Sequence, residues 1–199
     1  HGGAAARPFT THMNALDTDL YLRIATEIYL KRAVVGGVDR VFEMNRNFRN
    51  EGMDSSHSPE FTSLEAYEAY SDYNGMAELT RDLIQQAARD AFDLSEGEEI
   101  VRLADGTEYD LSGEWDRIDL YGSTSEALGE EITVETPRET LVKYAERIGL
   151  EVDDYAVSGK IVEDIFEELV ASKLWAPTFV YDFPEDTSPL TRYHRSRPG

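Results

Sequence analysis

Two alternating stretches joined by a polar loop restrict the fold of this 199-residue chain more than any other feature. Residues 40–49 and 60–70 alternate between apolar and polar side chains, which is the period of a half-buried β-strand. The residues between them, 50–58, are rich in Gly, Asp and Ser, which turns favour. The pattern therefore predicts an antiparallel hairpin with a long connection.

Alternation gives each predicted strand one apolar and one polar face. The apolar face carries Phe42, Met44 and Phe48 in the first strand, and Leu64, Ala66 and Tyr70 in the second. The other face carries Glu43, Asn45, Asn47 and Arg49 in the first strand, and Phe61, Ser63, Glu65 and Tyr67 in the second. If the strands pair in register, Arg49, Glu65, Tyr67 and Phe61 overlook one open surface.

Two interpretations of the polar face are open. It can be the solvated side of an antiparallel sheet, which needs no special residues. It can also be a pocket for a cation and a nucleotide. A carboxylate can hold an ammonium group, a tyrosine hydroxyl can orient it, a phenyl ring can stack on a base, and an arginine can grip phosphate. The paired aromatics and glutamates favour the pocket.

The rest of the chain mixes strands and helices. Strands are predicted at 20–25 and 176–184, with a small hairpin across Asp105-Gly106. Helices are predicted at 26–37 (with Thr26 as N-cap), 73–92, 136–150 and 158–174. This order indicates an α+β fold with an antiparallel sheet flanked by helices.

Composition excludes several classes of protein. The absence of cysteine excludes disulfides and thiolate metal sites, and a cytoplasmic location is the simplest expectation. The four histidines lack the spacing of a helical metal site, and no apolar run approaches the ~20 residues that span a membrane. The net charge is −21, and residues 61–187 carry 32 acids against nine bases. Most of such a surface repels a phosphate backbone, so any contact with nucleic acid is expected to be local or to lie outside these residues.

Residues 48–67 resemble motif 2 of the class II aminoacyl-tRNA synthetases, in the form typical of lysyl-tRNA synthetase. The resemblance rests on "FRNEG" (48–52) and "HSPEFTSLEAY" (57–67). It continues upstream through "HGGAAARPF" and "TEIYLKR", and downstream through "PTFVYDFPEDTSPL". It covers nearly the whole chain and is weakest from about 93 to 135.

The resemblance implies roles for eight residues. Arg49 matches the arginine that binds the ATP α-phosphate and the amino-acid carboxylate, and is the catalytic candidate. The other ATP-binding candidates are Glu51 near the adenine amino group, His57 near the outer phosphates and Phe61 stacked on adenine. The lysine-binding candidates are Glu65 and Tyr67, which match the pair that reads the side-chain ammonium, together with Glu27 and Gly3.

The implied chemistry is lysine activation. The carboxylate of lysine attacks the α-phosphorus of ATP to give lysyl-adenylate and pyrophosphate, and the lysyl group then passes to tRNA(Lys). Arg49 and Mg²⁺ neutralise charge on the phosphoryl oxygens, with no protein nucleophile. The implied partners are lysine, ATP and tRNA(Lys), with a homodimer for the full-length protein and no membrane.

The resemblance also implies that residues 1–199 form a partial catalytic domain, with a more variable hairpin and helical insertion at 93–175. Motif 1, motif 3, the Mg²⁺ ligands and the anticodon-binding domain are expected outside these residues. The isolated chain is then expected to have little or no activity. Two alternatives stay open: a lysine ligase paralogue that modifies elongation factor P or a lipid, and a non-catalytic interaction module.

Overall fold

The computed structural model describes residues 3–4, 6–54, 57–194 and 196. The chain divides into two compact units, residues 1–72 and 73–199. The strands and helices of the first unit are β1 (Thr10–Met13), β2 (Thr18–Tyr21), α1 (Glu27–Val35), β3 (Arg40–Phe48) and β4 (Glu60–Glu68). Those of the second are α2 (Tyr73–Phe92), β5 (Ile100–Arg102), β6 (Glu108–Asp110), β7 (Asp116–Asp119), α3 (Leu120–Leu128), α4 (Arg138–Arg147), α5 (Ser158–Leu169) and β8 (Thr178–Tyr181), with 3₁₀ turns at Ala171–Lys173 and Glu185–Thr187.

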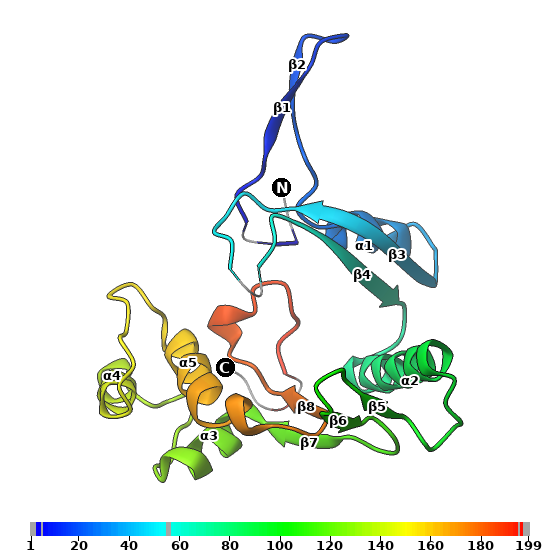
Figure 1. The fold of residues 1–199 in the computed structure, drawn as a ribbon. Coiled ribbons are helices and arrows are strands. Elements are labelled where there is room, and N and C mark those ends of the chain that lie inside the picture. The colour runs from blue at the N-terminus through cyan, green and yellow to red at the C-terminus, as the bar shows by residue number, and fades with distance from the viewer. Residues whose placement is uncertain (1–2, 5, 55–56, 195, 197–199) are drawn as a thin grey trace. The chain divides into compact units, whose positions relative to one another are not determined.

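The predicted hairpin is confirmed in the first unit. Strands β3 and β4 are antiparallel, and Asn45 lies opposite Ser63 while Asn47 lies opposite Phe61. Residues of equal parity therefore share a face, as the alternation requires. Figure 1 shows this long pair with α1 beside it, and the narrow β1–β2 hairpin extending away from it.

The polar face of the hairpin is the covered face. Asn45 and Asn47 are 8% and 1% exposed, whereas Phe42 and Met44 on the apolar face are 72% and 68% exposed. The segment leading into α1 lies on the polar side, because the hydroxyl of Thr26 accepts a hydrogen bond from Asn45. Arg49, Phe61, Glu65 and Tyr67 on the same face are half-buried, so the polar face is covered most completely at Asn45 and Asn47. Residues 23–26 lie over this face and form hydrogen bonds with Glu65, with Arg49 and with the Arg46 carbonyl.

The strand predicted at 20–25 ends early. Strand β2 stops at Tyr21, and Ile24, Ala25 and Thr26 are buried without strand pairing. These residues bond to the hairpin through Arg23 O, Ile24 O and the Thr26 N–H instead of through a strand ladder. Their apolar character reflects burial under the hairpin and not a β-conformation.

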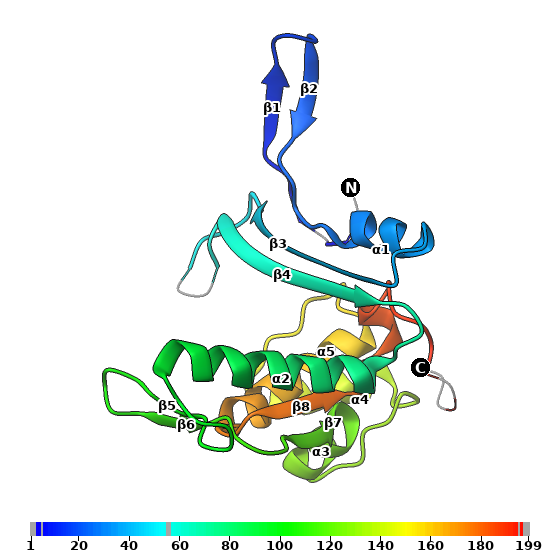
Figure 2. The same ribbon diagram turned by 90° about the vertical axis from the view of Figure 1, so that its right-hand side faces the viewer.

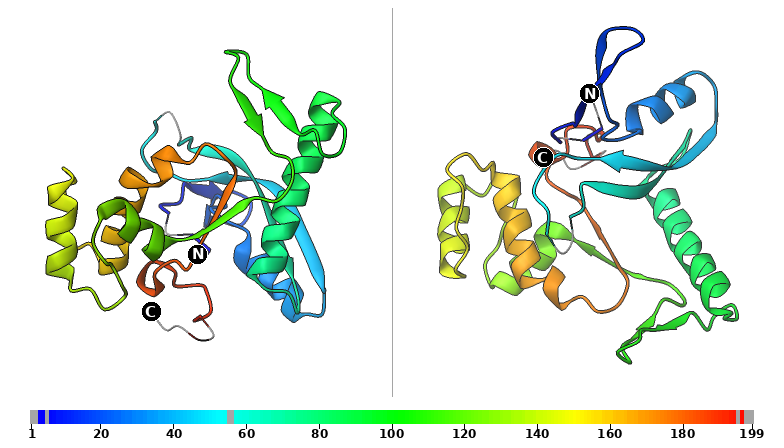
Figure 3. Two further views of the ribbon diagram at one scale, coloured as in Figure 1. Left: turned by 90° about the horizontal axis from the view of Figure 1, so that it is seen from below. Right: turned by 45° about the horizontal axis from the view of Figure 1, so that its top comes forward.

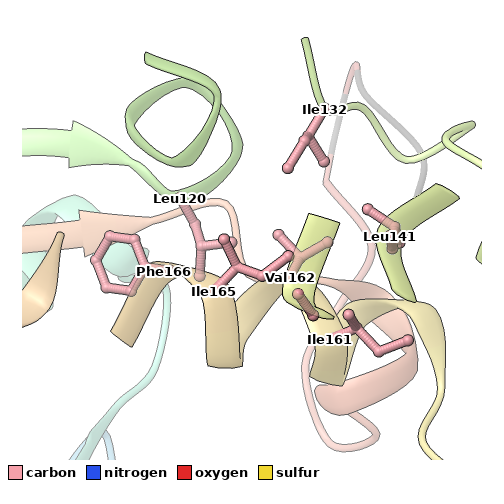
Figure 4. Close-up of a cluster of buried hydrophobic side chains, with 8 residues drawn as sticks. Leu120, Ile132, Leu141, Ile161, Val162, Ile165 and Phe166 are labelled. Carbon is pink, nitrogen blue, oxygen red and sulfur yellow. The ribbon is translucent and has the colours of Figure 1, made fainter. Parts of the chain in front are cut away.

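The core of the second unit lies between α3, α4 and α5. Helix α5 packs against both α3 and α4, and the three helices lie together in both views of Figure 3. The fully buried residues include Leu120, Leu141, Ile161 and Ile165, which meet in the cluster drawn in Figure 4. Burying each such side chain contributes about 1.5–3 kcal/mol, so this cluster holds the three helices together.

The strands of the second unit form two small sheets. Strands β5 and β6 make the predicted hairpin, and β7 pairs with β8 in parallel (Figure 2). The turn at 184–187 caps α5, because Asp186 accepts from the Gly159 N–H at 3.1 Å. A Cβ at position 159 would lie 1.9 Å from Asp186, so only glycine fits there. The described residues thus form a mixed fold of helices and small, mostly antiparallel sheets.

Candidate functional site

The carboxylate of Glu65 is the centre of a polar cluster on the covered face of the hairpin. Its Oε1 accepts from the Thr26 hydroxyl at 2.7 Å and from the Thr26 N–H at 3.1 Å. Its Oε2 accepts from the Tyr67 hydroxyl at 3.0 Å. Tyr67 reaches this oxygen because residues two apart in a strand point to the same side. A carboxylate offers about four acceptor positions, so Oε2 can still accept a further hydrogen bond.

The hydrogen bonds decide the ionisation of Glu65. Burial by itself would raise the pKa of its carboxyl group, but donation from Thr26 and Tyr67, with the nearby charge of Arg49, lowers the pKa below its ordinary value. The pKa of the Tyr67 hydroxyl is raised by burial, by its bond to Glu65 and by the charges of Glu27 and Glu65. At neutral pH the cluster therefore presents an ionised carboxylate beside a neutral phenol, which suits a cation.

Arg49 and Phe61 lie together on the same hairpin. The guanidinium carbon of Arg49 is 5.0 Å from the centroid of the Phe61 ring, and its Nε donates to the Ile24 carbonyl at 3.4 Å. The Arg49 N–H also donates to the Pro59 carbonyl at 2.9 Å, which ties the end of β3 to the start of β4. The arginine is thereby held on the face that carries Glu65, with an aromatic ring alongside.

Glu27 and Gly3 approach one another closely at the start of α1. Gly3 has a φ of +89°, and a Cβ built there would lie 2.9 Å from the Cβ of Glu27. Glu27 forms an ion pair with Lys31, whose ammonium nitrogen is 5.8 Å from the centroid of the Tyr67 ring. The charges of Glu27 and Glu65 both act on Tyr67, so the two carboxylates border one region.

The two loop candidates lie apart from this packing. Glu51 is exposed in the connection between β3 and β4. His57 is also exposed, and its Nδ1 lies 2.9 Å from the carboxylate of Asp54. The structure thus brings together six of the eight predicted residues, and leaves Glu51 and His57 on the loop.

Thr26 and Asn45 belong to the cluster but were not among the predicted site residues. Thr26 was expected only as an N-cap, yet no capping hydrogen bond from its side chain is present. Its hydroxyl bonds to Glu65, which lies 39 positions later in the chain. The sequence signal for Asn45 was its place on the same face of β3 as Arg49, whereas no local pattern indicated the contact of Thr26 with Glu65.

Other kinds of site are not evident in the described part of the chain. No group of three or more His, Asp or Glu side chains there could hold a metal ion. None of the described helices is long and apolar enough to cross a bilayer. A cavity of about 720 Å³ lies within residues 73–199, between the start of α3, the loop 131–134 and the segment 182–194. The walls of this cavity contain none of the eight predicted residues, so the cavity is separate from the Glu65 cluster.

Residues 1–198 match the family described as tRNA synthetases class II (D, K and N). The chain belongs to this family. The prediction from residues 48–67 is therefore confirmed at the level of the class, and the family members named as relatives refine it.

The relatives carry a consistent name. Proteins named lysine–tRNA ligase from Kineococcus radiotolerans and Mycolicibacterium gilvum are 60% and 61% identical over 200 residues. Each alignment covers 100% of this chain and 39% of the relative. A bifunctional lysylphosphatidylglycerol biosynthesis protein from Nocardia farcinica is 49% identical over 204 residues, which are 18% of its length. The chain thus spans about two fifths of the length of the curated ligases that it matches.

Proposed function

We propose that this chain supplies the motif 2 region of a lysine–tRNA ligase, in which it binds lysine and the α-phosphate of ATP. One observation carries the proposal: Arg49 and the ionised Glu65 lie on one face of the β3–β4 hairpin, and the charge of Arg49 acts on Glu65. A site that binds an amino acid with an ammonium side chain next to a nucleotide needs both groups. The carboxylate pairs with the ammonium, and the guanidinium pairs with the phosphate. The shared name of relatives at 54–61% identity supports lysine as the substrate.

Lysine recognition rests on Glu65 and Tyr67. The side-chain ammonium of lysine donates to Oε2 of Glu65 and to the phenol oxygen of Tyr67, which has a free lone pair. An apolar amino acid would leave the Glu65 carboxylate without this partner. That costs several kcal/mol, so discrimination by roughly 10³-fold or more is expected. Glu27, beside Gly3, is the second acid of the lysine pocket.

ATP activation rests on Arg49 and Phe61. A lysine carboxylate oxygen forms a bond to the α-phosphorus, and the bond to the pyrophosphate oxygen breaks, so that pyrophosphate leaves with its electron pair. The guanidinium of Arg49 donates to an α-phosphate oxygen and offsets the charge that develops there. Phe61 stacks on adenine, Glu51 lies near the adenine amino group, and His57 lies near the outer phosphates. Family resemblance implies Mg²⁺, but no group of three or more acidic or histidine side chains among the described residues could hold it.

The surroundings of the site follow from the same proposal. The chain forms one part of a class II core, in which an antiparallel sheet is flanked by helices. Residues 93–175 are the more variable hairpin and helical insertion of this core. Because the relatives are about two and a half times longer, activity is assigned to the full-length protein and little or none to these 199 residues alone. The full-length protein is proposed to be a cytoplasmic homodimer that charges tRNA(Lys).

The experiment is lysine-dependent exchange between ATP and pyrophosphate in the full-length protein. Wild type should need lysine, and Glu65→Gln should raise the KM for lysine about 100-fold while the KM for ATP changes less than threefold. The matched control is Glu60→Gln, which removes an exposed carboxylate from the same strand and should stay within twofold. Exchange supported equally by an apolar amino acid would refute the proposal.

A second acceptor is favoured by one relative. The Nocardia farcinica protein is named for lysylphosphatidylglycerol biosynthesis, and it aligns with the whole of this chain. Lysine activation would be common to both proteins, so the exchange assay does not separate them. A transfer assay separates them: labelled lysine is first transferred to tRNA(Lys), and phosphatidylglycerol vesicles are then added. Label in the lipid would assign the second acceptor.

A further inference from the structure

A line of hydrogen bonds runs along the covered face of the hairpin and ends on Glu65. Asn47 Nδ2 donates to Ser63 Oγ at 2.6 Å, and Ser63 Oγ donates to Asn45 Oδ1 at 3.3 Å. Asn45 Nδ2 then donates to Thr26 Oγ1 at 3.1 Å, and the Thr26 hydroxyl donates to Glu65 Oε1 at 2.7 Å. The chain of donors crosses from β3 to β4, back to β3, and on to the residue before α1.

Every donor in this line points toward the carboxylate. A hydroxyl that accepts a hydrogen bond becomes a better donor, so successive bonds of one direction strengthen each other. The burial supports this effect: Asn47 and Thr26 are each 1% exposed and Asn45 is 8% exposed. The hydroxyl of Thr26, the last donor in the line, is therefore polarised and donates strongly to Oε1 of Glu65.

One polar atom at the start of this line has no partner. Asn47 Oδ1 is buried and has no hydrogen-bond partner among the described residues. Turning the amide would give this oxygen a donor in Ser63, but it would leave Nδ2 without its acceptor. Both orientations therefore leave one polar atom unpaired, and the observed one keeps the Ser63 hydroxyl available to donate to Asn45.

We propose that Thr26 is a positioning residue for lysine specificity: with the Asn47–Ser63–Asn45 line behind it, it fixes Oε1 of Glu65 so that Oε2 meets the substrate ammonium at one set distance. This inference rests on the proposed function and adds to it a residue that does not touch the reacting atoms. Two bonds from Thr26, one from its N–H and one from its hydroxyl, prevent rotation of the carboxylate. A shorter diamino acid such as ornithine then cannot bring its ammonium into reach.

The test compares Thr26→Val with Thr26→Ser in the full-length protein. Valine keeps the shape and the backbone N–H but removes the hydroxyl, whereas serine keeps the hydroxyl. Thr26→Val should raise the KM for lysine about tenfold or more, because a bond to a charged group is lost, with kcat and the KM for ATP changed less than threefold. The ratio of kcat/KM for lysine over ornithine should fall about tenfold. Thr26→Ser should restore both quantities to within threefold of wild type.

Two further variants separate positioning from folding. Thr62→Val makes the same chemical change on the exposed face of β4 and should leave both quantities within twofold. Ser63→Ala interrupts the line two residues before Thr26 and should produce a smaller change in the same direction, about two- to fivefold. If Thr26→Val lowers the melting temperature, Ser63→Ala tests the same line of hydrogen bonds without changing Thr26.

Each outcome has a distinct meaning. A lysine KM and an ornithine ratio within twofold of wild type in Thr26→Val would overturn the inference. Parallel losses in kcat and in both KM values, not restored by serine, would also overturn it, because they show a structural role. If wild type itself shows no lysine-dependent exchange, the proposed function fails and the inference fails with it, before any variant is compared.

Discussion

Lys31 forms an ion pair with Glu27, one turn earlier in α1. A substrate ammonium that binds Glu27 must therefore compete with a cation of the chain itself. Exposed and half-exposed pairs of this kind are worth about 0.2–1 kcal/mol. We expect Lys31→Gln to lower the KM for lysine about two- to fivefold, measured by pyrophosphate exchange. A KM that rises would mean that Lys31 supports the pocket instead of competing for it.

Arg49 should be needed for adenylate formation but not for folding. Its guanidinium bonds to one carbonyl and packs on Phe61, so its removal leaves few buried groups unpaired. Loss of a phosphate-neutralising donor should lower kcat about 10²- to 10³-fold for Arg49→Ala. Arg46→Ala is the control, because Arg46 is exposed on the opposite face and pairs with Glu60. Exchange near the wild-type rate in Arg49→Ala would remove Arg49 from the mechanism.

Gly3 should matter for lysine binding because of what lies beside it. Alanine at position 3 has an unfavourable φ and would also crowd Glu27, with its Cβ at 2.9 Å. Gly37→Ala is the matched control: its φ is +100°, but nothing lies within 4 Å of the added Cβ. Both variants should lower the melting temperature, and only Gly3→Ala should raise the KM for lysine, by about fivefold or more. Equal KM values would separate Gly3 from the pocket.

Acid should weaken the first unit through Glu65. Because the pKa of its carboxyl group is lower in the folded chain than its ordinary value of 4.5, the ionised form stabilises the fold. This contribution is fully present above about pH 4.5 and is lost as the pH falls through the lower folded pKa. Urea titrations of wild type and Glu65→Gln between pH 3 and pH 7 should therefore converge at the acid end. A difference that stays constant over this range would contradict the assignment. Arg49 acts on this carboxyl group through its charge, Tyr67 donates to it, and Glu43 lies opposite Glu65 in the strand register. Glu27 and Lys31 lie beside Tyr67.

Glu99 depends on Arg89 in the second unit. Its side chain is 2% exposed, Arg89 pairs with its Oε1, and its Oε2 is buried with no partner among the described residues. Burial would raise the pKa of Glu99, but Arg89 and the N–H of Gly97 lower it. Arg89→Ala should lower the melting temperature at pH 7 by several degrees. Arg102→Ala, which breaks the exposed pair with Glu108, should change it by less than about 2 °C. Similar shifts in the two variants would mean that burial adds nothing to the Arg89 pair.

Local pattern was enough for the long elements. The helical spacing of residues 73–92 matches α2 to the residue, and the alternation of 40–49 and 60–70 gives the bounds of β3 and β4 within one or two residues. Helix α3 was not predicted, because "LYGSTSEAL" is rich in residues that favour turns. In the structure the hydroxyls of Ser123, Thr124 and Ser125 bond to carbonyls one turn back and so remain compatible with a helix. The parallel pairing of β7 with β8 joins residues about 60 positions apart, which no local pattern encodes.

The sequence alone determined the family and which residues share a face of the hairpin, since motif spacing and strand alternation are local properties. The tertiary structure decided which face is covered. Residues 23–26 lie over the polar side, and this places Thr26 on Glu65, Arg49 on the Ile24 carbonyl and Gly3 against Glu27. Such contacts join residues more than 20 positions apart, so they depend on packing and hydrogen bonding that only the folded chain supplies.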